Sequence, residues 1–505
     1  MRKKIYIALA ALTMCLSSCD SFLEVTPSDK QTAEQLYSSK SGYYTALNGI
    51  YDGLASTALY GQEMTWGTVD VLAKRYAAPT GNTAYQDIIN NSLSTASAAP
   101  FFSAIWENAY ELILASNLLM DQIDKRDATI LPDEEAQLMK GELFAIRAFL
   151  HLDMLRLFGP VMYTDPTALS IPYNESAQVS ALDLLPANEV IEKIIRDLDE
   201  AETLLSTTDP VITEGPLASE GSDTDNVQLR YRQYRFNYYT VIALKARAYI
   251  WANDNANALA QAKRLIEDDK VQSYFPAVDP NSLLANSSNP DRVFSSEVLT
   301  GIYMKTRDNV YSNHFSPDAS SYNRLQPYSL YVLGNMFTIP LFSITETSSD
   351  YRFQSQWEAS SAAGSQGYIF TKYKSIDQPD PNDEDSEYFY AKMIPLVRLQ
   401  EMYYIASACE EDPTNQVKWF DAARARRGCS PSMYVSYYWT YGYGRFFLMN
   451  EFLREFYGEG QSYYFFKRLP VITGYEPGMV AYYFNGSAQA NTTVATPPLP
   501  EDEMK

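Results

Sequence analysis

The chain has 505 residues, of which 46% are hydrophobic and 20% are charged, and this composition is typical of a globular protein with a substantial core. It carries 62 acidic residues against 40 basic ones, a formal net charge of −22. Because phosphate groups are bound by concentrated Lys and Arg, this charge argues against nucleic acid as a partner and disfavours a polyanionic substrate.

The first 19 residues have the layout of a lipoprotein signal. Basic residues at positions 2–4 precede an apolar run at 5–14, and Ser17 and Ser18 stand before Cys19. Small residues at that place suit cleavage in front of an acylated cysteine. We therefore expect residues 1–18 to be a signal peptide and Cys19 to carry a lipid anchor, with a plain secreted protein as the alternative.

Apolar residues at three- and four-residue steps predict helices along much of the chain. In chain order, the predicted helices are 32–54, 101–123, 132–158, 187–205, 236–252, 256–268, 395–410 and 416–427. The helix 132–158 has the clearest ends, because Pro132 and three acidic residues suit its start and Gly159-Pro160 its end. Strand-like runs such as 298–304 are few. The pattern predicts a mostly α fold.

One helix pair, 236–252 and 256–268, carries alanines where two helices must approach each other. These alanines are Ala243, Ala246 and Ala248 on the first helix and Ala258 and Ala262 on the second. Recurring helical hairpins of this size are typical of a tetratricopeptide-like scaffold, although the match to the full repeat consensus is loose.

Two long segments, 59–100 and 276–390, interrupt the helices and are rich in Tyr, Asn, Ser and Gly. Loops of this length in a compact protein are usually functional. Their aromatic residues include Trp66, Tyr76, Tyr85, Tyr322, Tyr328, Tyr331 and Trp357. Aromatic faces can stack on sugar rings, but a chain with 40 tyrosines uses most of its rings in packing, so the core is the alternative place for each of them.

From these segments we predict a ligand site. Trp66 and Trp357 are the first candidates for stacking a sugar ring, and Tyr76 and Tyr322 would extend the platform. The neighbouring groups Asp70, Arg75 and Arg324 would form hydrogen bonds to the ligand, and an arginine could also hold a carboxylate.

Catalytic and metal-binding patterns are missing from the sequence. His151 lies on the most apolar predicted helix and is interpreted as a core residue, and His314 has no nucleophile motif beside it. The acidic stretch 380–387 lacks the glycine and the spacing of an EF-hand loop, so we interpret it as a solvated loop and predict neither a cofactor nor a calcium ion. Cys409 and Cys429 would lie at the far ends of antiparallel helices, which predicts two free thiols.

Seven short motifs follow one another in a fixed order along the chain, at 19–27, 147–161, 243–250, 397–405, 421–428, 454–460 and 498–503. Together they resemble the SusD/RagB family of outer-membrane nutrient-binding lipoproteins, over essentially the whole chain after Cys19. The chain departs from the family at 462–465, where Ser-Tyr-Tyr-Phe replaces Arg-Trp-Phe-Asp, and at Glu451-Phe452, where a Glu-Arg pair is expected. Both departures fall on positions that look structural in the family.

The resemblance implies one SusD-like domain over residues 19–505, with helical scaffold mainly at 32–58, 101–270 and 392–470. It also implies a cell-surface lipoprotein of the outer membrane that captures an oligosaccharide and delivers it to a SusC-like TonB-dependent transporter. A RagB-like lid that captures peptides is the alternative, and an all-α glycoside hydrolase ranks behind both, so we predict no enzyme. The aromatic stretch 434–443 is interpreted only as surface or interface.

Overall fold

The computed structural model describes residues 33–77, 79–179, 181–216, 227–283, 289–327, 342, 347–360, 368–377, 388–431, 439, 444–473 and 495–500. The predicted signal peptide, Cys19, Tyr328, Tyr331, the acidic stretch 380–387 and most of the aromatic stretch 434–443 lie outside these residues. No helix among the described residues combines the length and the apolar character that crossing a membrane requires.

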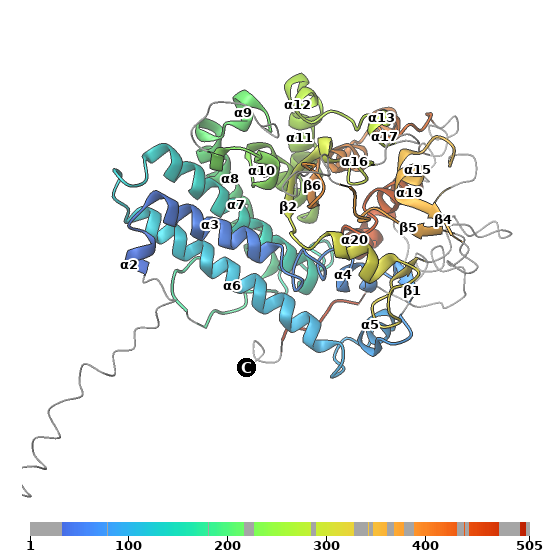
Figure 1. The fold of residues 1–505 in the computed structure, drawn as a ribbon, viewed down its shortest axis with the longest axis horizontal. Helices are drawn as coiled ribbons and strands as arrows, with labels where there is room; N and C mark the ends of the chain where they lie inside the picture. The colour runs from blue at the N-terminus through green and yellow to red at the C-terminus, as the bar shows by residue number, and fades with distance from the viewer. Residues whose placement is uncertain are drawn as a thin grey trace, which may run out of the picture.

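Helices packed side by side, several of them long, make up most of the N-terminal half of the protein (Figure 1). In chain order they are α2 (Ala33–Leu36), α3 (Lys40–Leu54), α6 (Ala99–Asp124), α7 (Asp133–Phe158), α8 (Ala187–Thr208), α9 (Val211–Glu214), α10 (Tyr238–Trp251), α11 (Asn255–Ile266) and α12 (Asp269–Tyr274). Consecutive helices pack in pairs, α7 on α8 and α10 on α11, and the predicted alanines of the second pair are fully buried. The predicted mostly α, helix-pair fold is confirmed.

The first predicted helix is divided in two. Its periodic pattern continues from 32 to 54, but the chain leaves the helix at residues 37–39 and α3 starts again behind Ser39. The Ser39 side chain accepts a hydrogen bond of 3.2 Å from the Gly42 amide. That cap satisfies a free helical N–H group and favours a new helix start at this point.

The other described segments mix shorter helices with three two-stranded antiparallel sheets. Short helices α4 (Thr68–Leu72) and α5 (Thr83–Ile89) lie in the first irregular segment, and α13 (Pro280–Leu283), α14 (Asp308–Val310) and α15 (Tyr351–Gln356) lie in the second. Short 3-10 helices η1 (Val227–Leu229), η2 (Arg232–Tyr234) and η3 (Ser295–Glu297) and the π-helix η4 (Tyr311–Phe315) lie between these elements. The helices α16 (Leu399–Cys409), α17 (Pro413–Ala425), α19 (Gly444–Glu455) and α20 (Ser462–Thr473) complete the fold.

The longest strand pair joins β2 (Val298–Tyr303) to β6 (Met393–Arg398), with Ile302 opposite Ile394 and Gly301 opposite Pro395. The sequence predicted a helix from Pro395 onward, which is wrong at its start, because the strand continues to Arg398 before α16 begins. A short apolar run fits a buried strand as well as a helix, and the pairing with β2 decides between them. The other pairs are β1 (Tyr76–Ala77) with β3 (Gln326–Pro327) and β4 (Trp357–Ala359) with β5 (Tyr368–Phe370).

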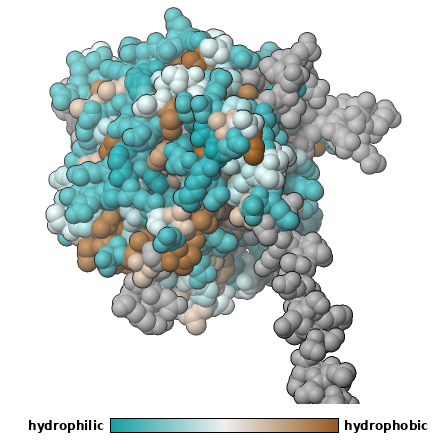
Figure 2. Space-filling view, turned by 90° about the vertical axis from the view of Figure 1, so that its left-hand side faces the viewer, coloured by the Kyte–Doolittle hydropathy of each residue, from teal (hydrophilic) through white to brown (hydrophobic). Residues whose placement is uncertain are grey.

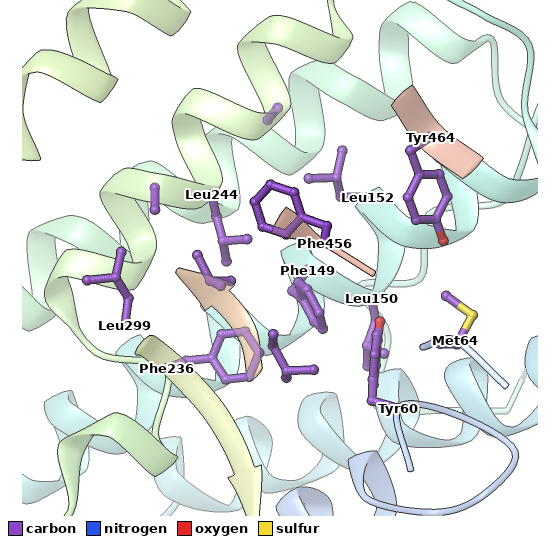
Figure 3. Close-up of a cluster of buried hydrophobic side chains, with 14 of the residues drawn as sticks. Tyr60, Met64, Phe149, Leu150, Leu152, Phe236, Leu244, Leu299, Phe456 and Tyr464 are labelled. Atoms are coloured by element: carbon purple, nitrogen blue, oxygen red, sulfur yellow. The ribbon is translucent and has the colours of Figure 1, made fainter. Parts of the chain in front are cut away.

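One large hydrophobic core continues through both halves of the chain. Figure 3 shows part of it, where Phe149 from α7 lies beside Phe236 and Tyr60, with ring centroids 5.1 and 5.0 Å away. Side chains far apart in the sequence therefore pack in a single cluster. The outer face in Figure 2 is mainly hydrophilic, with hydrophobic residues gathered near its lower edge.

Both cysteines of the described residues are free and buried, as the helix geometry predicted. Burial raises the pKa of both thiols to about 12. They are therefore protonated and unreactive at neutral pH.

Candidate functional site: buried motifs and an exposed loop surface

The charged residues of the sequence motifs form buried ion pairs between distant segments. Arg427 follows α17 and binds Glu297 at 2.7 Å and Glu455 at 2.7 Å. Arg398, at the end of β6, pairs with Glu455 and with Glu459 at 2.9 Å. Burial opposes ionisation of Glu455, but Arg427 and Arg398 outweigh it and hold the pKa of this carboxyl well below its usual range. These motif residues hold the C-terminal segments together.

A second group of motif residues fastens the helix pairs in the same way. Arg147 of α7 makes a bidentate contact with Asp197 of α8, its Nε and Nη2 lying 2.6 and 2.9 Å from the two carboxylate oxygens. Arg247 of α10 binds Glu401 of α16, with its Nε 2.9 Å from the carboxylate. All four side chains are buried. Because these side chains are paired inside the protein, the motifs explain the fold and leave ligand recognition to other residues.

The histidine of α7 is a core residue, as predicted. Its Nδ1 lies 2.9 Å from the Arg147 carbonyl oxygen, and its Nε2 accepts a hydrogen bond from the Asn174 amide at 3.0 Å. Burial lowers the pKa of His151 to about 3. The ring is therefore neutral at physiological pH and bonded at both nitrogens, which leaves no free nitrogen for acid–base chemistry.

The two tryptophans chosen for sugar stacking are buried, and the prediction is corrected on this point. Trp66 is 1% exposed and packs against Tyr373, with 4.9 Å between ring centroids. Trp357 is 4% exposed and lies between Phe370 at 5.1 Å and Tyr457 at 5.0 Å. A ring with both faces packed has no face for a sugar. Aromatic residues outside long helices can fill a core as well as line a site, and the sequence did not separate these roles.

Asp70, Arg75 and Tyr76 are also buried, and they connect the first irregular segment to the region between α19 and α20. Asp70 accepts hydrogen bonds from the Gly458 amide at 2.9 Å and from the Tyr76 hydroxyl at 3.4 Å. The Arg75 guanidinium lies over the Tyr457 ring, 4.8 Å from its centroid. Burial raises the pKa of Asp70 to about 7. The prediction that these groups face a ligand is corrected, because they face one another.

Tyr322 is the predicted aromatic residue that lies on the surface, with 53% of its area exposed. Arg324, two residues on, is half-buried. The two irregular segments meet here, since β1 pairs with β3 and the Gly81 amide donates to the Ser321 carbonyl at 3.1 Å. In Figure 1 the blue β1 and α5 lie beside the yellow segment that precedes β3. The structure therefore brings 59–100 and 276–390 together, as a shared site requires.

A glycine allows this close approach. A Cβ atom added at Gly81 would lie 3.1 Å from the Tyr322 amide nitrogen and 3.2 Å from the Ser321 carbonyl oxygen. Any larger residue would push the two segments apart by a few tenths of an ångström. Gly81 therefore determines how close the Tyr322 backbone comes to α5.

The structure shows a second exposed aromatic group that the sequence reasoning missed. Tyr231 and Phe389 stack at 5.9 Å with their planes 12° apart, and Tyr234 connects them to Tyr303, whose ring is 5.9 Å from that of Tyr234. Tyr303 is 49% exposed. The sequence contained a sign of Tyr303, because this residue lies in the recognised strand-like run 298–304. Nothing in the sequence indicated an exposed Tyr231, because its left-handed backbone conformation, at φ 54°, is seen only in the structure.

Within the described residues, no group of three or more His, Cys, Asp or Glu side chains is placed to hold a metal ion. The exposed candidates are tyrosine rings and polar loop groups, which bind by stacking and hydrogen bonding. This surface is suited to binding neutral, hydroxyl-rich molecules.

Comparisons with known proteins agree on one family. The family described as "Starch-binding associating with outer membrane" matches residues 21–214. The SusD-like protein P38 of Formosa agariphila is 26% identical over 258 residues, 50% of this chain and 43% of that protein. The SusD-like protein P25 of the same organism is 22% identical over 296 residues, 56% of this chain and 48% of that protein. The aligned part is thus less than half the length of either relative.

Solved structures show the same fold at low sequence identity. A SusD superfamily protein from Bacteroides thetaiotaomicron has a TM-score of 0.59 at 17% identity, covering 85% of this chain and 89% of its own. A laminarin-binding SusD-like protein has a TM-score of 0.58 at 15% identity, with 93% and 98% covered. The surface glycan-binding protein A from Bacteroides uniformis scores 0.60 at 16% identity, with 88% and 91% covered. The predicted resemblance is confirmed, because the family model, the curated relatives and the solved structures are all SusD-like.

Proposed function

We propose that this chain captures an oligosaccharide at the surface that includes Tyr322 and Arg324. The observation that carries the proposal is the exposed Tyr322 ring at the place where β1, β3 and Gly81 join the two irregular segments. An exposed ring on a fixed backbone can stack on the apolar face of a sugar at small entropic cost. The names of the laminarin-binding and glycan-binding structural relatives support the same ligand class.

The remaining parts of the function are proposals of the same kind. A lipid on Cys19 would hold the protein at the outer membrane, and a SusC-like TonB-dependent transporter would receive the glycan. Residues 19–505 would fold as one SusD-like domain, which the large core containing both Tyr43 and Phe466 supports. The protein would contribute affinity and no chemistry, so incubated oligosaccharides should be recovered uncut.

Calorimetry with exposed-tyrosine variants tests the ligand site. The protein is titrated with a panel of neutral oligosaccharides, including laminarin fragments, and with a peptide mixture. Tyr322→Ala should weaken glycan binding by roughly thirtyfold, the effect of losing about 2 kcal/mol at a hot spot. Tyr163→Ala is the matched control, because Tyr163 is 62% exposed on the α7–α8 connection.

The outcomes distinguish the possible ligands and binding surfaces. Binding that survives in Tyr322→Ala but is lost in Tyr303→Ala would move the site to the second aromatic group. Binding of peptides and of no glycan would favour the RagB-like alternative. Equal loss in Tyr163→Ala would show that the effect is not specific to either surface.

A further inference from the structure

A cavity of about 60 Å³ lies between the helices α10, α16, α19 and α20, and none of its lining residues belongs to the proposed glycan surface. Apolar and aromatic side chains form most of its wall. These are Ile250, Trp251, Tyr404, Ile405, Ala408, Leu448, Phe452, Tyr464 and Phe465. Tyr464 also lies at one side of the core cluster drawn in Figure 3.

The polar part of the wall carries an excess of positive charge. Three guanidinium groups line the cavity, from Arg156, Arg247 and Arg468. Arg156 pairs with Asp153, and Arg247 pairs with Glu401.

The third guanidinium, that of Arg468, has no carboxylate within 4.0 Å among the residues that the structure describes. Burial lowers the pKa of Arg468 to about 10, so it is still protonated at neutral pH. Three cations therefore face two carboxylates.

Hydrogen-bond donors are also in excess in the wall of the cavity. The Nε of Arg156, the Nη1 of Arg247, the Nε1 of Trp251 and the hydroxyl of Tyr464 are buried and have no acceptor among the described residues. Buried donors in folded proteins are nearly always paired, because an unpaired one costs free energy. Water supplies as many donors as acceptors, whereas a carboxylate supplies acceptors alone. The lining therefore complements an anion.

The size and the walls limit the ligand further. A water-sized group needs roughly 10–15 Å³ of such volume, so the cavity has room for about four to six non-hydrogen atoms. The apolar walls suit a short hydrocarbon tail. We propose that this cavity binds a short-chain monocarboxylate, with its carboxylate on Arg468 and its tail against Trp251 and Phe452. This ligand differs in class from the glycan and needs none of the residues near Tyr322.

Butyrate and its neutral isostere butyramide are the probes for this site, titrated into the purified full chain in chloride-free buffer and followed by calorimetry and thermal unfolding. We expect butyrate to bind and raise the melting temperature, and butyramide to bind at least about tenfold more weakly, because the charge-assisted contact is lost. Arg468→Gln should remove the preference for butyrate. Tyr322→Ala should leave butyrate binding unchanged.

A second variant keeps the test decisive if Arg468→Gln folds poorly. Ala408→Leu adds side-chain volume to the cavity wall and leaves all three arginines in place, so it should abolish butyrate binding. The proposal is overturned if butyrate does not bind, if butyramide binds equally well, or if Ala408→Leu binds butyrate as the wild type does.

Discussion

The helix pairs of the N-terminal half and the ionic C-terminal region are held together by different forces. α7 and α8 bury apolar faces against each other, with Arg147 and Asp197 as a single ionic contact between them. Around Glu455, by contrast, guanidinium groups from Arg352, Arg398 and Arg427 converge from three separate parts of the chain. The first region depends on many small contributions that repeat along the sequence. The second depends on a few long-range pairs.

This difference predicts the most damaging single substitution. Glu455→Gln should lower the free energy of unfolding by about 3–5 kcal/mol, because it removes a buried negative charge that three buried guanidinium groups share. Chemical denaturation measures the change. The control is Asp121→Asn, which removes a surface pair between Asp121 and Lys125 and should cost less than about 1 kcal/mol. Equal losses in the two variants would show that the buried network is not a special source of stability.

Trp66, one of the two tryptophans predicted to bind sugar, gives an effect of similar size. Trp66→Ala should cost about 3–5 kcal/mol, because it removes a large side chain that is 1% exposed. Trp66→Phe retains much of the volume and should lose less. Thermal unfolding gives the stability, and calorimetry with the bound glycan gives the affinity. A stable Trp66→Ala protein with weakened glycan binding would instead support the original sequence interpretation.

Sequence patterns identified the elements whose determinants are local. α7 was predicted to within a residue at its start, because Pro132 and Gly159-Pro160 mark its ends by backbone geometry alone. Pro395 was misplaced in a helix because its partner, Gly301, is 94 positions away in the sequence. The predictions for Trp66 and Trp357 were wrong for the same reason. The rings that pack against them, Tyr373 and Tyr457, are far away in the sequence. Periodicity contains no information about such distant partners.

The pH dependence of stability tests the connection made by Asp70. Burial raises its pKa from an ordinary 3.8 to about 7, so the folded protein keeps a proton that the unfolded chain releases. The stability that protonated Asp70 contributes to the fold is therefore lost as the pH rises from about 4 to 7. Asp70→Asn should be free of this loss, and its stability relative to the wild type should rise by roughly 2–3 kcal/mol between pH 5 and pH 8. Parallel curves for the two proteins would show that Asp70 is ionised in the fold.

The smallest expected effect concerns the glycine between the two irregular segments. Gly81→Ala places a methyl group 3.1 Å from the Tyr322 amide, so the segments must separate slightly, at a cost of about 1 kcal/mol or less. Gly49→Ala is its control. Gly49 lies on α3 with no atom within 4 Å of an added Cβ, so alanine should stabilise that helix by roughly 0.5–1 kcal/mol.

Glycan affinity then shows whether the joined segments act as one surface. If Tyr322 stacks on the ligand from a backbone positioned by Gly81, Gly81→Ala should weaken binding, but less than Tyr322→Ala does, because the ring itself is retained. Calorimetry on both variants at equal folded fraction separates this effect from unfolding. Unchanged affinity in Gly81→Ala, together with a large loss in Tyr322→Ala, would mean that the tyrosine binds without needing the contact between the segments.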